Sequence, residues 1–523
     1  MKTRYIYLSF AAICIGARSL GAVACTLNGT DSPADRDSLA AIDRVAVVND
    51  VMAQTAAEVY EASNAAAIWR YPVSLSSIGL RLDLRREQEA AVRAEGDGLT
   101  AGRFEAGSYM HLDSRSTVEA EASYTRGVKR NVLWNSTSDY DLLYPHVVAD
   151  TVGGDLTSEQ YAFAGGYAHR GDRFVWGAMA SYRALHEFRQ VDPRPRNITS
   201  DLSADVSGGF DLGSRYVGVT AGVRVYRQNQ QVDYYDTNGA NTSQIPMTGL
   251  GTYFDRYSGA GDGTTSYTYK GAGYGVSLQS VPKDGCGWSV MAAYERFGFE
   301  RLLRSGNKVP ITALKRDTYS AVAAWRSPRS MVEWGVELGA EYENRKGDEN
   351  VIDNGALGVN NVLATFTMYD LRRGGVSLGG VVRFRNRAGY LFVRPHVAWR
   401  SVREGYRYPQ RSMSVSALVG GCDIGYRIRR GRWLADITAG GGYTHALASS
   451  LKLPVSVETA LREMVGYDFE RASDEPVTAG AALDLNYGAS TSVAAFVSLG
   501  WRMYVGHANA SGHMFSGSVG VRF

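Results

Sequence analysis

The chain has 523 residues, with 56 Lys and Arg against 53 Asp and Glu and a formal net charge of +3. This near balance gives no indication of nucleic-acid binding. Outside the N-terminal segment, no stretch approaches the roughly 20 consecutive apolar residues of a spanning helix, which excludes a helical membrane protein. The 59 Gly and 32 Tyr exceed average usage, which for Gly is about 7%. A transmembrane barrel is allowed, because each strand needs only about 10 alternating residues.

Residues 1–24 have the pattern of a cleavable export signal. Lys2 and Arg4 precede the apolar run Tyr5–Gly16, and small residues close the segment at Ala22-Val23-Ala24. The mature chain would begin near Cys25. Ordinary cleavage and lipid attachment to Cys25 both stay open, although Ala22 stands where a lipid-attachment site usually carries Leu.

The four cysteines give no sign of a cross-linked or metal-binding framework. Cys14 leaves with the signal, and Cys25, Cys286 and Cys422 are far apart in a chain without a C-x-x-C. Neither a disulfide framework nor a zinc site is indicated. The sequence therefore predicts no metal and no cofactor.

Residues 25–76 are predicted to be a helical segment ahead of the barrel. Ser32-Pro33-Ala34-Asp35 supplies an N-cap, a Pro at the first helical position and an acidic residue three positions on. Apolar residues then recur at near-helical spacing, which predicts a helix from about Asp35 to Glu61. Two places for this segment stay open: the lumen, as a plug, or the periplasm, packed under the barrel.

Residues 77–523 are predicted to be an all-β domain, a transmembrane antiparallel β-barrel. Apolar and polar residues alternate with a period of two in many segments, for example Val217–Val225 and Val493–Met503. Short and long connections alternate strictly, as in outer-membrane barrels with short periplasmic turns and longer outward loops. The short turns are 113–115, 169–172, 213–215, 282–285, 326–329, 386–388, 430–431 and 488–490. The main long loops are 128–156, 229–265, 301–315, 344–374 and 447–473, with shorter ones near 89–100, 188–199, 403–410 and 506–511.

Eight turns and nine loops join eighteen strands, beginning with one near Ser77–Arg86. An even number returns the last strand to the periplasmic side, where both termini of such barrels belong. To keep this count, the apolar run Val362–Met368 is assigned to a loop. Sixteen and twenty strands are the alternatives. Barrels of sixteen to eighteen strands leave room for an aqueous lumen unless something fills it.

The chain ends on Phe523 after an alternation in which Phe515, Val519 and Val521 share its face. Ending on Phe resembles the C-terminal signal of outer-membrane β-barrels that their assembly machinery reads. This resemblance implies an outer-membrane location in a Gram-negative bacterium. It also implies the assembly machinery and membrane lipids as partners.

Over its mature length the chain resembles uncharacterised outer-membrane barrel families, domains of unknown function, with an N-terminal helix. Asn64-Ala65-Ala66 also resembles the Asn-Pro-Ala motif of the long-chain fatty-acid transporter superfamily, and lacks its Pro. In that superfamily the N-terminal segment lies in the lumen as a hatch. Both resemblances imply a large barrel with a segment near its lumen.

Charged residues on the face opposite the apolar one are predicted to line the lumen. A charge on the lipid face costs about 2 to 4 kcal/mol at the bilayer midplane. Such residues could set the selectivity of a solute path, or pair across strands and with the N-terminal segment. The predicted lumen-lining residues are Arg81, Asp83, Arg85, Glu119, Glu121, Asp205, Arg224, Glu333, Glu337, Glu341, Arg383, Arg394, His396, Arg400, Asp423, Arg427, Asp436, Asp484, Arg502 and Arg522.

Catalytic residues are not predicted. Gly375-Val376-Ser377-Leu378-Gly379 matches the nucleophile-elbow pattern, but it lies in an alternating strand with no helix after it. His396 and His445 lie on or just beyond different strands. A His within hydrogen-bond reach of a Ser or Asp at the barrel rim would favour an enzyme.

Three functions follow, and no residue names a cargo. The leading hypothesis is a porin-like channel or transporter for an unidentified solute. The second is a membrane platform for a surface lipoprotein or a transport or secretion complex, with the long loops as contact surface. The third is an enzyme located at the rim.

Overall fold

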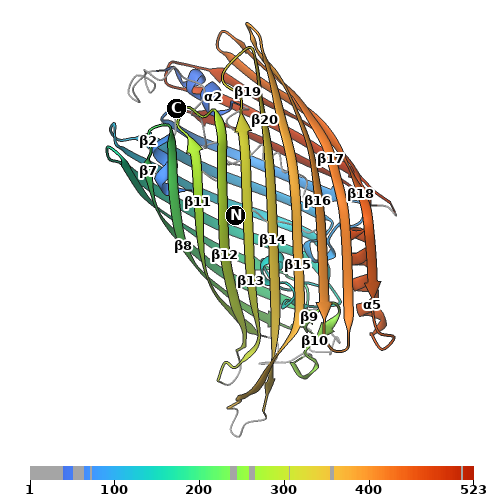
Figure 1. Ribbon diagram of the computed structural model, residues 1–523. Helices are drawn as coiled ribbons and strands as arrows, with labels where there is room; N and C mark the ends of the chain where they lie inside the picture. The colour runs from blue at the N-terminus through green and yellow to red at the C-terminus, as the bar shows by residue number, and fades with distance from the viewer. Residues whose placement is uncertain are drawn as a thin grey trace.

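The computed structural model describes residues 39–50, 64–70, 73–235, 244–257, 266–304, 307–353, 359–507 and 510–523. Eighteen strands form one closed antiparallel barrel in which each strand pairs with its neighbours in chain order (Figure 1). The predicted number is confirmed, and the alternatives of sixteen and twenty are wrong. The strands are β1 (Leu75–Glu87), β2 (Gly98–His111), β3 (Ser116–Val132), β5 (Gly154–Arg170), β6 (Phe174–Phe188), β7 (Arg194–Asp211), β8 (Arg215–Asp233), β11 (Tyr267–Pro282), β12 (Gly287–Leu303), β13 (Pro310–Arg326), β14 (Val332–Ile352), β15 (Val362–Arg385), β16 (Gly389–Tyr406), β17 (Arg411–Arg430), β18 (Trp433–Lys452), β19 (Val477–Gly488), β20 (Ala494–Val505) and β21 (Ser511–Arg522).

The barrel closes where the last strand pairs with the first. β21 runs antiparallel to β1 from Gly512 opposite Glu87 to Arg522 opposite Ser77. Phe523 extends this seam by one residue, because its N–H donates to the Ser76 carbonyl at 2.9 Å and its carbonyl accepts from the Ser76 N–H at 2.8 Å. Closure leaves neither terminal strand with an open edge along this length.

One predicted loop is wrong. Val362–Met368 is not part of a loop but the beginning of β15, and it pairs with the end of β14, with register shifts at Gly347/Asp348 and Val351/Ile352. The β14–β15 hairpin therefore continues past the rim as a two-stranded ribbon, seen at the lower end of Figure 1. The run Val362–Met368 pairs with β14 and lengthens β15, so the number of strands is unchanged.

The outer surface of the barrel is apolar between two aromatic belts. Trp334 and Tyr342 of β14 mark the two belts and are separated by about 26 Å along the tilted strand at 3.3 Å per residue. At a strand tilt of about 40° this corresponds to about 20 Å across the membrane, somewhat less than the apolar band of about 25 Å of outer-membrane barrels. The belt near the short turns contains the exposed Phe174, Trp176, Phe210, Trp288, Trp334, Phe384, Trp433 and Phe523. The belt toward the long connections contains the exposed Tyr161, Tyr182, Tyr274, Tyr319, Tyr342, Trp399 and Tyr443.

Within the part of the chain that the structure describes, the helices are short. The 3₁₀ helices are η2 (Ala65–Arg70), η3 (Arg93–Glu95) and η4 (Asp255–Tyr257). The α-helices are α2 (Ala41–Val48), α4 (Tyr140–Leu143) and α5 (Thr459–Ala472). Among the residues described, no helix has the length and apolar character to cross a membrane.

The predicted helix Asp35–Glu61 is found only in part. Within residues 39–50 it covers Ala41–Val48 and ends at Asn49, so a continuous helix through Asp50 is wrong. The guanidinium of Arg427 donates to the carbonyls of Ala46 at 2.9 Å and Asn49 at 2.6 Å, and so caps the helix. Residues 1–38 and 51–63, with the signal, Cys25 and the N-cap, lie outside the described residues.

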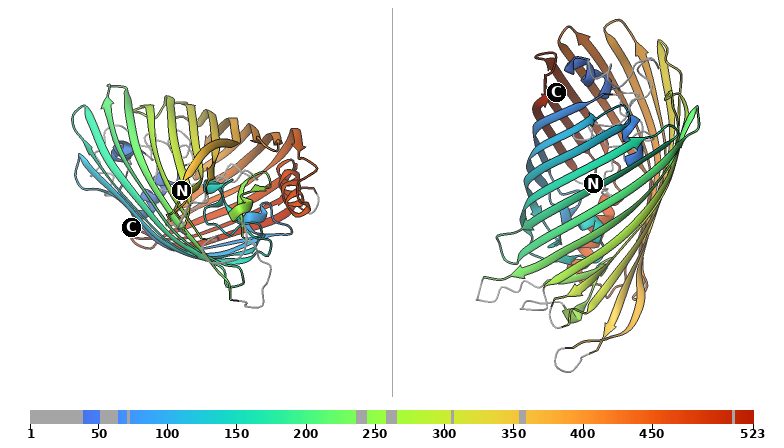
Figure 2. Two further views of the ribbon diagram at one scale, coloured as in Figure 1. Left: turned by 90° about the horizontal axis from the view of Figure 1, so that it is seen from below. Right: turned by 90° about the vertical axis from the view of Figure 1, so that its left-hand side faces the viewer.

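Several predicted loops contain secondary structure that was not expected from the sequence, including η3 in the loop near 89–100. Loop 128–156 contains α4 and β4 (Val148–Ala149), loop 229–265 contains β9 (Ile245–Gly249) and β10 (Thr252–Tyr253), and loop 447–473 contains α5. β4, β9 and β10 form a second small sheet. Figure 2 (left) looks into the end of the barrel that carries the long connections. There β9 and β10 lie within the outline of the barrel and α5 lies at its rim.

Candidate functional site

Segments of chain lie against the inner wall of the barrel near both of its ends. At the end with the short turns the barrel holds residues 39–50 and 64–70, called here the N-terminal plug. At the opposite end it holds residues 133–153 and 244–257, called here the loop plug. Each plug packs on its own cluster of buried apolar residues, and the two clusters are separate. The charged inner wall lies between them.

The α2 part of the N-terminal plug is fixed to strands β15 and β17 by arginines. Arg383 pairs with Asp50, with Nη1 donating to Oδ2 at 2.6 Å, and it also pairs with Glu333. Arg429 pairs with Asp43. The Arg383 pair is buried, whereas the Arg429 pair is about one-third exposed on both sides. Buried attachment therefore concentrates at the C-terminal end of α2.

The η2 part of the N-terminal plug lies against a different arc of the wall, formed by β3, β5, β6 and β7. The Oδ1 of Asn64 accepts from the N–H of Ala66 at 2.9 Å and begins the 3₁₀ turn. A Cβ on Gly177 would lie 2.5 Å from the Ala65 carbonyl, so only glycine lets the backbone come this close. The Arg170 guanidinium lies 4.2 Å above the Trp69 ring.

The loop plug is fixed by buried arginines that donate to its carbonyls. Arg345 donates to the carbonyls of Asp141 at 2.6 Å and Tyr144 at 3.0 Å, and it pairs with Glu343 at 2.7 Å. Arg411 donates to the Leu250 carbonyl at 2.8 Å. These contacts come from β14 and β17, so the wall holds the plug by its backbone from well-separated strands.

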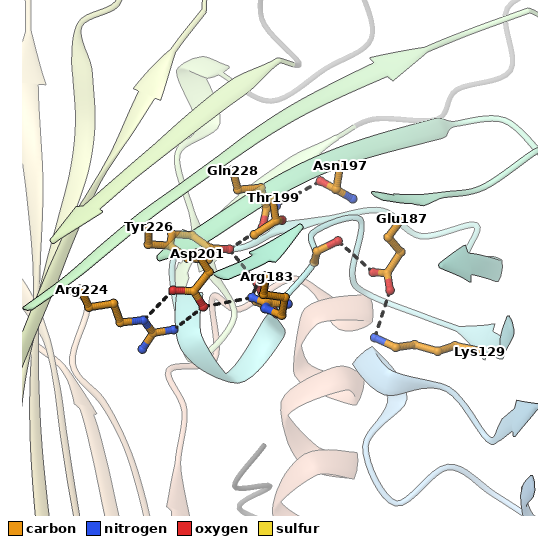
Figure 3. A network of polar contacts seen from close by, with 11 residues as sticks. Lys129, Arg183, Glu187, Asn197, Thr199, Asp201, Arg224, Tyr226 and Gln228 are labelled. Atoms are coloured by element: carbon orange, nitrogen blue, oxygen red, sulfur yellow. Dashed lines mark hydrogen bonds and ion pairs between the residues drawn. The ribbon is translucent and has the colours of Figure 1, made fainter. Parts of the chain in front are cut away.

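A polar network continues this attachment on the other side of the barrel (Figure 3). Arg183 of β6 pairs with Asp139 of the loop plug at 2.6 Å, and the Tyr226 hydroxyl donates to the same carboxylate at 2.9 Å. Burial raises the pKa of Asp139, but the charge and hydrogen bonds of Arg183 outweigh this effect and lower the pKa. Asp201 joins Arg183 to Arg224, with 2.9 Å between Arg224 Nε and Asp201 Oδ1.

The same arc also binds the loop plug through neutral groups and a second carboxylate. Glu187 accepts from the Ser138 hydroxyl at 3.1 Å and pairs with Lys129 at 3.4 Å. The Ser136 carbonyl accepts from Asn197 at 3.0 Å and from Gln230 at 2.9 Å. The side chains of residues 135–138 are buried, so this end of the loop plug is fixed at many points.

Several predicted lumen-lining residues form ion pairs. Arg81 pairs with Asp83 at 2.8 Å, and Arg427 pairs with Asp436, with Nη2 donating to Oδ2 at 2.7 Å. The remaining pairs are Arg224 with Asp201, Arg383 with Glu333 and Asp50, Arg522 with Asp484 at 3.7 Å, and Arg85 with Glu87 at 3.9 Å. Pairing across strands and with the N-terminal segment is thus present, and Arg383 does both.

Other predicted residues lie flat over glycines of a neighbouring strand. A Cβ on Gly440 would overlap the Asp423 carboxylate, and one on Gly222 would overlap that of Asp205. Similar contacts join Gly421 with His396, Gly480 with Arg502, Gly166 with Glu119 and Gly375 with Arg400. Arg394 is opposite Asp423 in the β16–β17 register, and Glu337 and Glu341 of β14 are opposite Gly379 and Gly375 of β15. Glu121 is opposite Ala164 of β5. Glycines therefore leave space for charged side chains to lie along the wall.

Two histidines at the rim contact carboxylates. His507 Nδ1 lies 2.9 Å from Asp474 Oδ1, and His445 Nδ1 lies 2.7 Å from Glu475 Oε1. The carboxylates also organise the backbone, since Asp474 accepts from the His507 N–H and Glu475 from the Ala446 N–H. That last bond is the main cause of a lowered pKa of Glu475. Both histidines are largely exposed, and among the described residues no serine hydroxyl is bonded to either.

Metal binding and disulfide formation find no support in the described part of the chain. It contains no group of three or more His, Cys, Asp or Glu arranged to hold a metal ion. Cys286 and Cys422 are free thiols.

The plug anchors Asp43, Asp50, Arg301 and Arg345 were missed from the sequence. Arg301 and Arg345 fall within the predicted loops 301–315 and 344–374, whereas β12 and β14 extend beyond them and place both side chains on the inward face. Both arginines act as anchors because they bond to carbonyls of the loop plug, which is distant from them in sequence. Periodicity within a strand does not contain this information.

A closed antiparallel barrel with an apolar outer band, two aromatic belts and a charged inner wall defines a transmembrane barrel of the outer-membrane type. The chain belongs to a family of unknown function (DUF6850), whose model matches residues 65–523. No curated protein matches it.

Solved structures with a similar fold are outer-membrane receptors and transporters. The copper transporter OprC has a TM-score of 0.43 at 9% identity, over 86% of this chain and 80% of that chain. The outer-membrane transporter YddB from Escherichia coli has a TM-score of 0.39 at 9% identity, with the same coverage. A mutant ferric enterobactin receptor (PfeA) from Pseudomonas aeruginosa has a TM-score of 0.39 at 8% identity, also with the same coverage. At these values the likeness concerns the barrel fold and carries no argument about cargo.

Proposed function

We propose that this protein is a gated conduit for a polar solute in the outer membrane of a Gram-negative bacterium. The observation that carries the proposal is the charged inner wall between two separate plugs, with side chains such as Asp205 and Asp423 laid flat over glycines. A barrel that served only as an anchor could carry apolar side chains on the inner wall between the two plugs. A polar wall with side chains kept along its surface instead suits passage of a hydrated solute.

The outer surface supports the membrane location. The aromatic belts lie on either side of an apolar band, as they do at the two interfaces of outer-membrane barrels. The short turns would then face the periplasm and the long connections the outside. In this orientation the N-terminal plug closes the periplasmic mouth.

The N-terminal plug is the more easily released of the two. Its described part consists of α2 and η2, and its buried ion-pair contact is Arg383 with Asp50. The loop plug is covered by a larger apolar cluster and is bonded to β6, β7, β8, β12, β14 and β17. Gating is therefore assigned to displacement of the N-terminal plug.

Conductance across a planar bilayer tests the proposal. The intact protein is expected to show rare, brief openings, and a variant lacking residues 26–70 is expected to show frequent or continuous current. Heat modifiability of both proteins on gels controls for folding of the barrel. Absence of current from a folded deletion variant would refute a conduit.

A platform for another protein is the second candidate, and the protruding β14–β15 ribbon favours it. Val351, Leu363 and Phe366 on this ribbon are 46%, 66% and 56% exposed, beyond the rim of the barrel. Exposed apolar side chains on a projecting element suit contact with a partner. Shortening the ribbon from Asp348 to Thr367 should abolish co-purification of a stoichiometric partner. A conduit without a partner would keep its conductance after the same change.

His507 lies within hydrogen-bond reach of Asp474 at the rim, the arrangement that would favour an enzyme, but we assign the rim histidines no catalytic role. The carboxylates of Asp474 and Glu475 are engaged with backbone N–H groups, and this bonding accounts for the two histidine contacts as loop structure. Substituting His507 or His445 by Gln is expected to leave conductance unchanged.

A further inference from the structure

Arg301 is a completely buried guanidinium at the boundary between the barrel wall and the loop plug. It lies near the end of β12, and its side chain is 0% exposed. Nη1 donates to the carbonyls of Val147 and Met247, both at 3.1 Å. Nε and Nη2 have no hydrogen-bond partner among the described residues. Three of its five N–H donors are therefore unused among the described residues.

Other buried polar groups around Arg301 also lack hydrogen bonds of good geometry. Both ring nitrogens of His146 and the hydroxyl of Thr312 make no hydrogen bond to any described residue. The Tyr269 hydroxyl interacts with the side chains of Thr137 and Arg301 but makes no hydrogen bond of good geometry. His146, Tyr269 and Thr312 are fully buried. Such orphaned groups are few in native proteins, and each one calls for an explanation.

These groups surround the same place. Arg301 is the register partner of Tyr269 on β11 and of Thr312 on β13. His146 interacts electrostatically with Arg301. The rings of His146 and Tyr269 both meet the ring of Phe299, with centroid distances of 6.2 and 5.8 Å. The orphaned donors thus come from the loop plug and three adjacent strands.

The charge of Arg301 is not neutralised by a direct ion pair within the described part of the chain. Glu349 interacts with Arg301 at longer range, but its Oε1 accepts from the Tyr406 hydroxyl at 2.6 Å. Arg345 and Arg189 are equally buried, and they contact Glu343 and Asp150, both at 2.7 Å. Arg301 differs from both in having no close carboxylate among the described residues. A buried charge without a close counter-charge is strongly unfavourable.

We infer that Arg301, His146, Tyr269 and Thr312 form a buried binding site for a small inorganic anion of the halide class. The site offers N–H and O–H donors, which is the chemistry that selects an anion. The carboxylate of Glu349, the register partner of Thr312, is engaged by the Tyr406 hydroxyl and makes no ion pair with Arg301 within 4 Å. One negative charge would neutralise Arg301 and use the orphaned donors. The anion would join the loop plug to β11, β12 and β13.

This site is independent of solute passage. It lies between the loop plug and the wall, beyond the outer aromatic belt, and it does not involve the charged wall between the plugs. Chloride would act as a structural ion that keeps the loop plug in place. Failure of the conduit proposal would leave the site unaffected, and the reverse also holds.

Bromide replacement tests the site directly. Crystals of the full-length protein grown in sodium bromide should show an anomalous peak among Arg301, His146, Tyr269 and Thr312. The same position in crystals grown with sodium gluconate should show no anomalous signal. Density without anomalous scattering in bromide would mean that water satisfies these donors, and the inference would be wrong.

Thermal unfolding in detergent provides the second measurement. At constant ionic strength, replacing gluconate by chloride should raise the Tm of the wild type by at least about 2 °C, as expected for a ligand of the folded state. Tyr269→Phe, which removes one hydroxyl with little change of shape, should shift the chloride response to several-fold higher concentration. Arg301→Met should abolish the response.

Arg345→Met is the matched control. It removes an equally buried arginine that also donates to loop-plug carbonyls, but one that already has a carboxylate partner. Its Tm should fall while the chloride response persists. Equal chloride responses of the wild type and Arg301→Met would overturn the proposed site, even if both proteins fold.

Discussion

Arg383 in the barrel wall and Asp50 at the end of the first described segment form a buried ion pair, although 333 positions separate them in sequence. Arg383 is shared, because its other terminal nitrogen pairs with Glu333. Glu333 in turn accepts from Arg385 Nε at 2.7 Å. The N-terminal plug is thus held by a charge chain that belongs to the wall, with Asp50 as its last member.

Asp50→Asn is expected to loosen the N-terminal plug. Removing one partner of a buried pair costs about 3–5 kcal/mol when the remaining charge is left uncompensated. The cost here is expected to be smaller, because Arg383 keeps Glu333 as a counter-charge. If the plug closes the conduit, open probability in a planar bilayer should rise at least several-fold. Asp43→Asn is the matched control, because its pair with Arg429 is partly exposed and such pairs contribute about 0–1 kcal/mol. Equal behaviour of the two variants would contradict gating through Asp50.

Gly177→Ala should displace η2 from the wall. The added Cβ would lie 2.5 Å from the backbone of Ala65, and backbone cannot move aside as a flexible side chain can. The expected result is faster labelling of a cysteine introduced at Ala66. Gly379→Ala provides the control, since a Cβ there meets nothing within 4 Å. Unchanged labelling in Gly177→Ala would show that η2 accommodates the methyl group.

Arg345→Met should destabilise the loop plug. The substitution leaves the Glu343 carboxylate buried without its closest cation and removes two bonds to plug carbonyls. A loss of about 3–5 kcal/mol is expected, measured by denaturant unfolding in detergent. The double variant Arg345→Met with Glu343→Leu should recover much of this loss, because both charges are then gone. No recovery would mean that the carbonyl bonds dominate.

Protection of α5 should decrease as pH rises from about 4 to about 7. Burial raises the pKa of Asp468 to about 7, with the charge of Glu404 acting in the same direction and that of Arg93 against it. A carboxyl whose pKa is raised on folding stabilises the folded state while it holds its proton. That contribution is lost as pH rises from the unfolded pKa of about 3.9 through the folded value.

Hydrogen–deuterium exchange of α5 amides, corrected for the intrinsic pH dependence, measures this effect. Asp468→Asn should flatten the profile and give more protection than the wild type above pH 7. Glu463→Gln is the control, because Glu463 is an exposed carboxylate on the same helix. A wild-type profile as flat as that of Asp468→Asn would contradict the assignment.

Phe523→Ala should lower the yield of folded barrel in the membrane. The expectation combines the resemblance of Phe523 to an assembly signal with its place at the closing seam, where its backbone bonds to Ser76. The substitution keeps both backbone bonds and removes the aromatic ring alone. Heat-modifiable protein in membrane fractions measures the effect. Phe515→Ala is the control, because Phe515 is another exposed aromatic residue of β21.

The barrel itself could be predicted from the sequence because its determinants are local. Alternation assigns each side chain to the lipid or the inner face, and charges such as Asp205 and Arg224 mark the inner one. Turn residues then separate the strands. The run Val362–Met368 was assigned to a loop to keep the strand count even, because the sequence does not show that this run lengthens β15 by pairing with the polar end of β14.

The helices were less predictable. Ala41–Val48 ends where it does because Arg427, nearly four hundred residues later, caps its carbonyls. Helix α5 lies in a stretch read as a loop, and its buried residues Leu461, Met464 and Val465 contact the loop plug. Neither boundary nor packing partner is encoded near the residues concerned.

The sequence by itself determined a closed barrel of eighteen strands with a charged inner face, because lipid on one side and water on the other impose an alternation that each strand carries alone. Only the tertiary structure decided which segments of the chain lie inside that barrel and which charged side chains hold these segments in place. Asp50 meets Arg383, and Arg301 meets two plug carbonyls, through contacts between segments far apart in sequence. Contacts of this kind depend on closure of the barrel, which brings distant strands around a common interior.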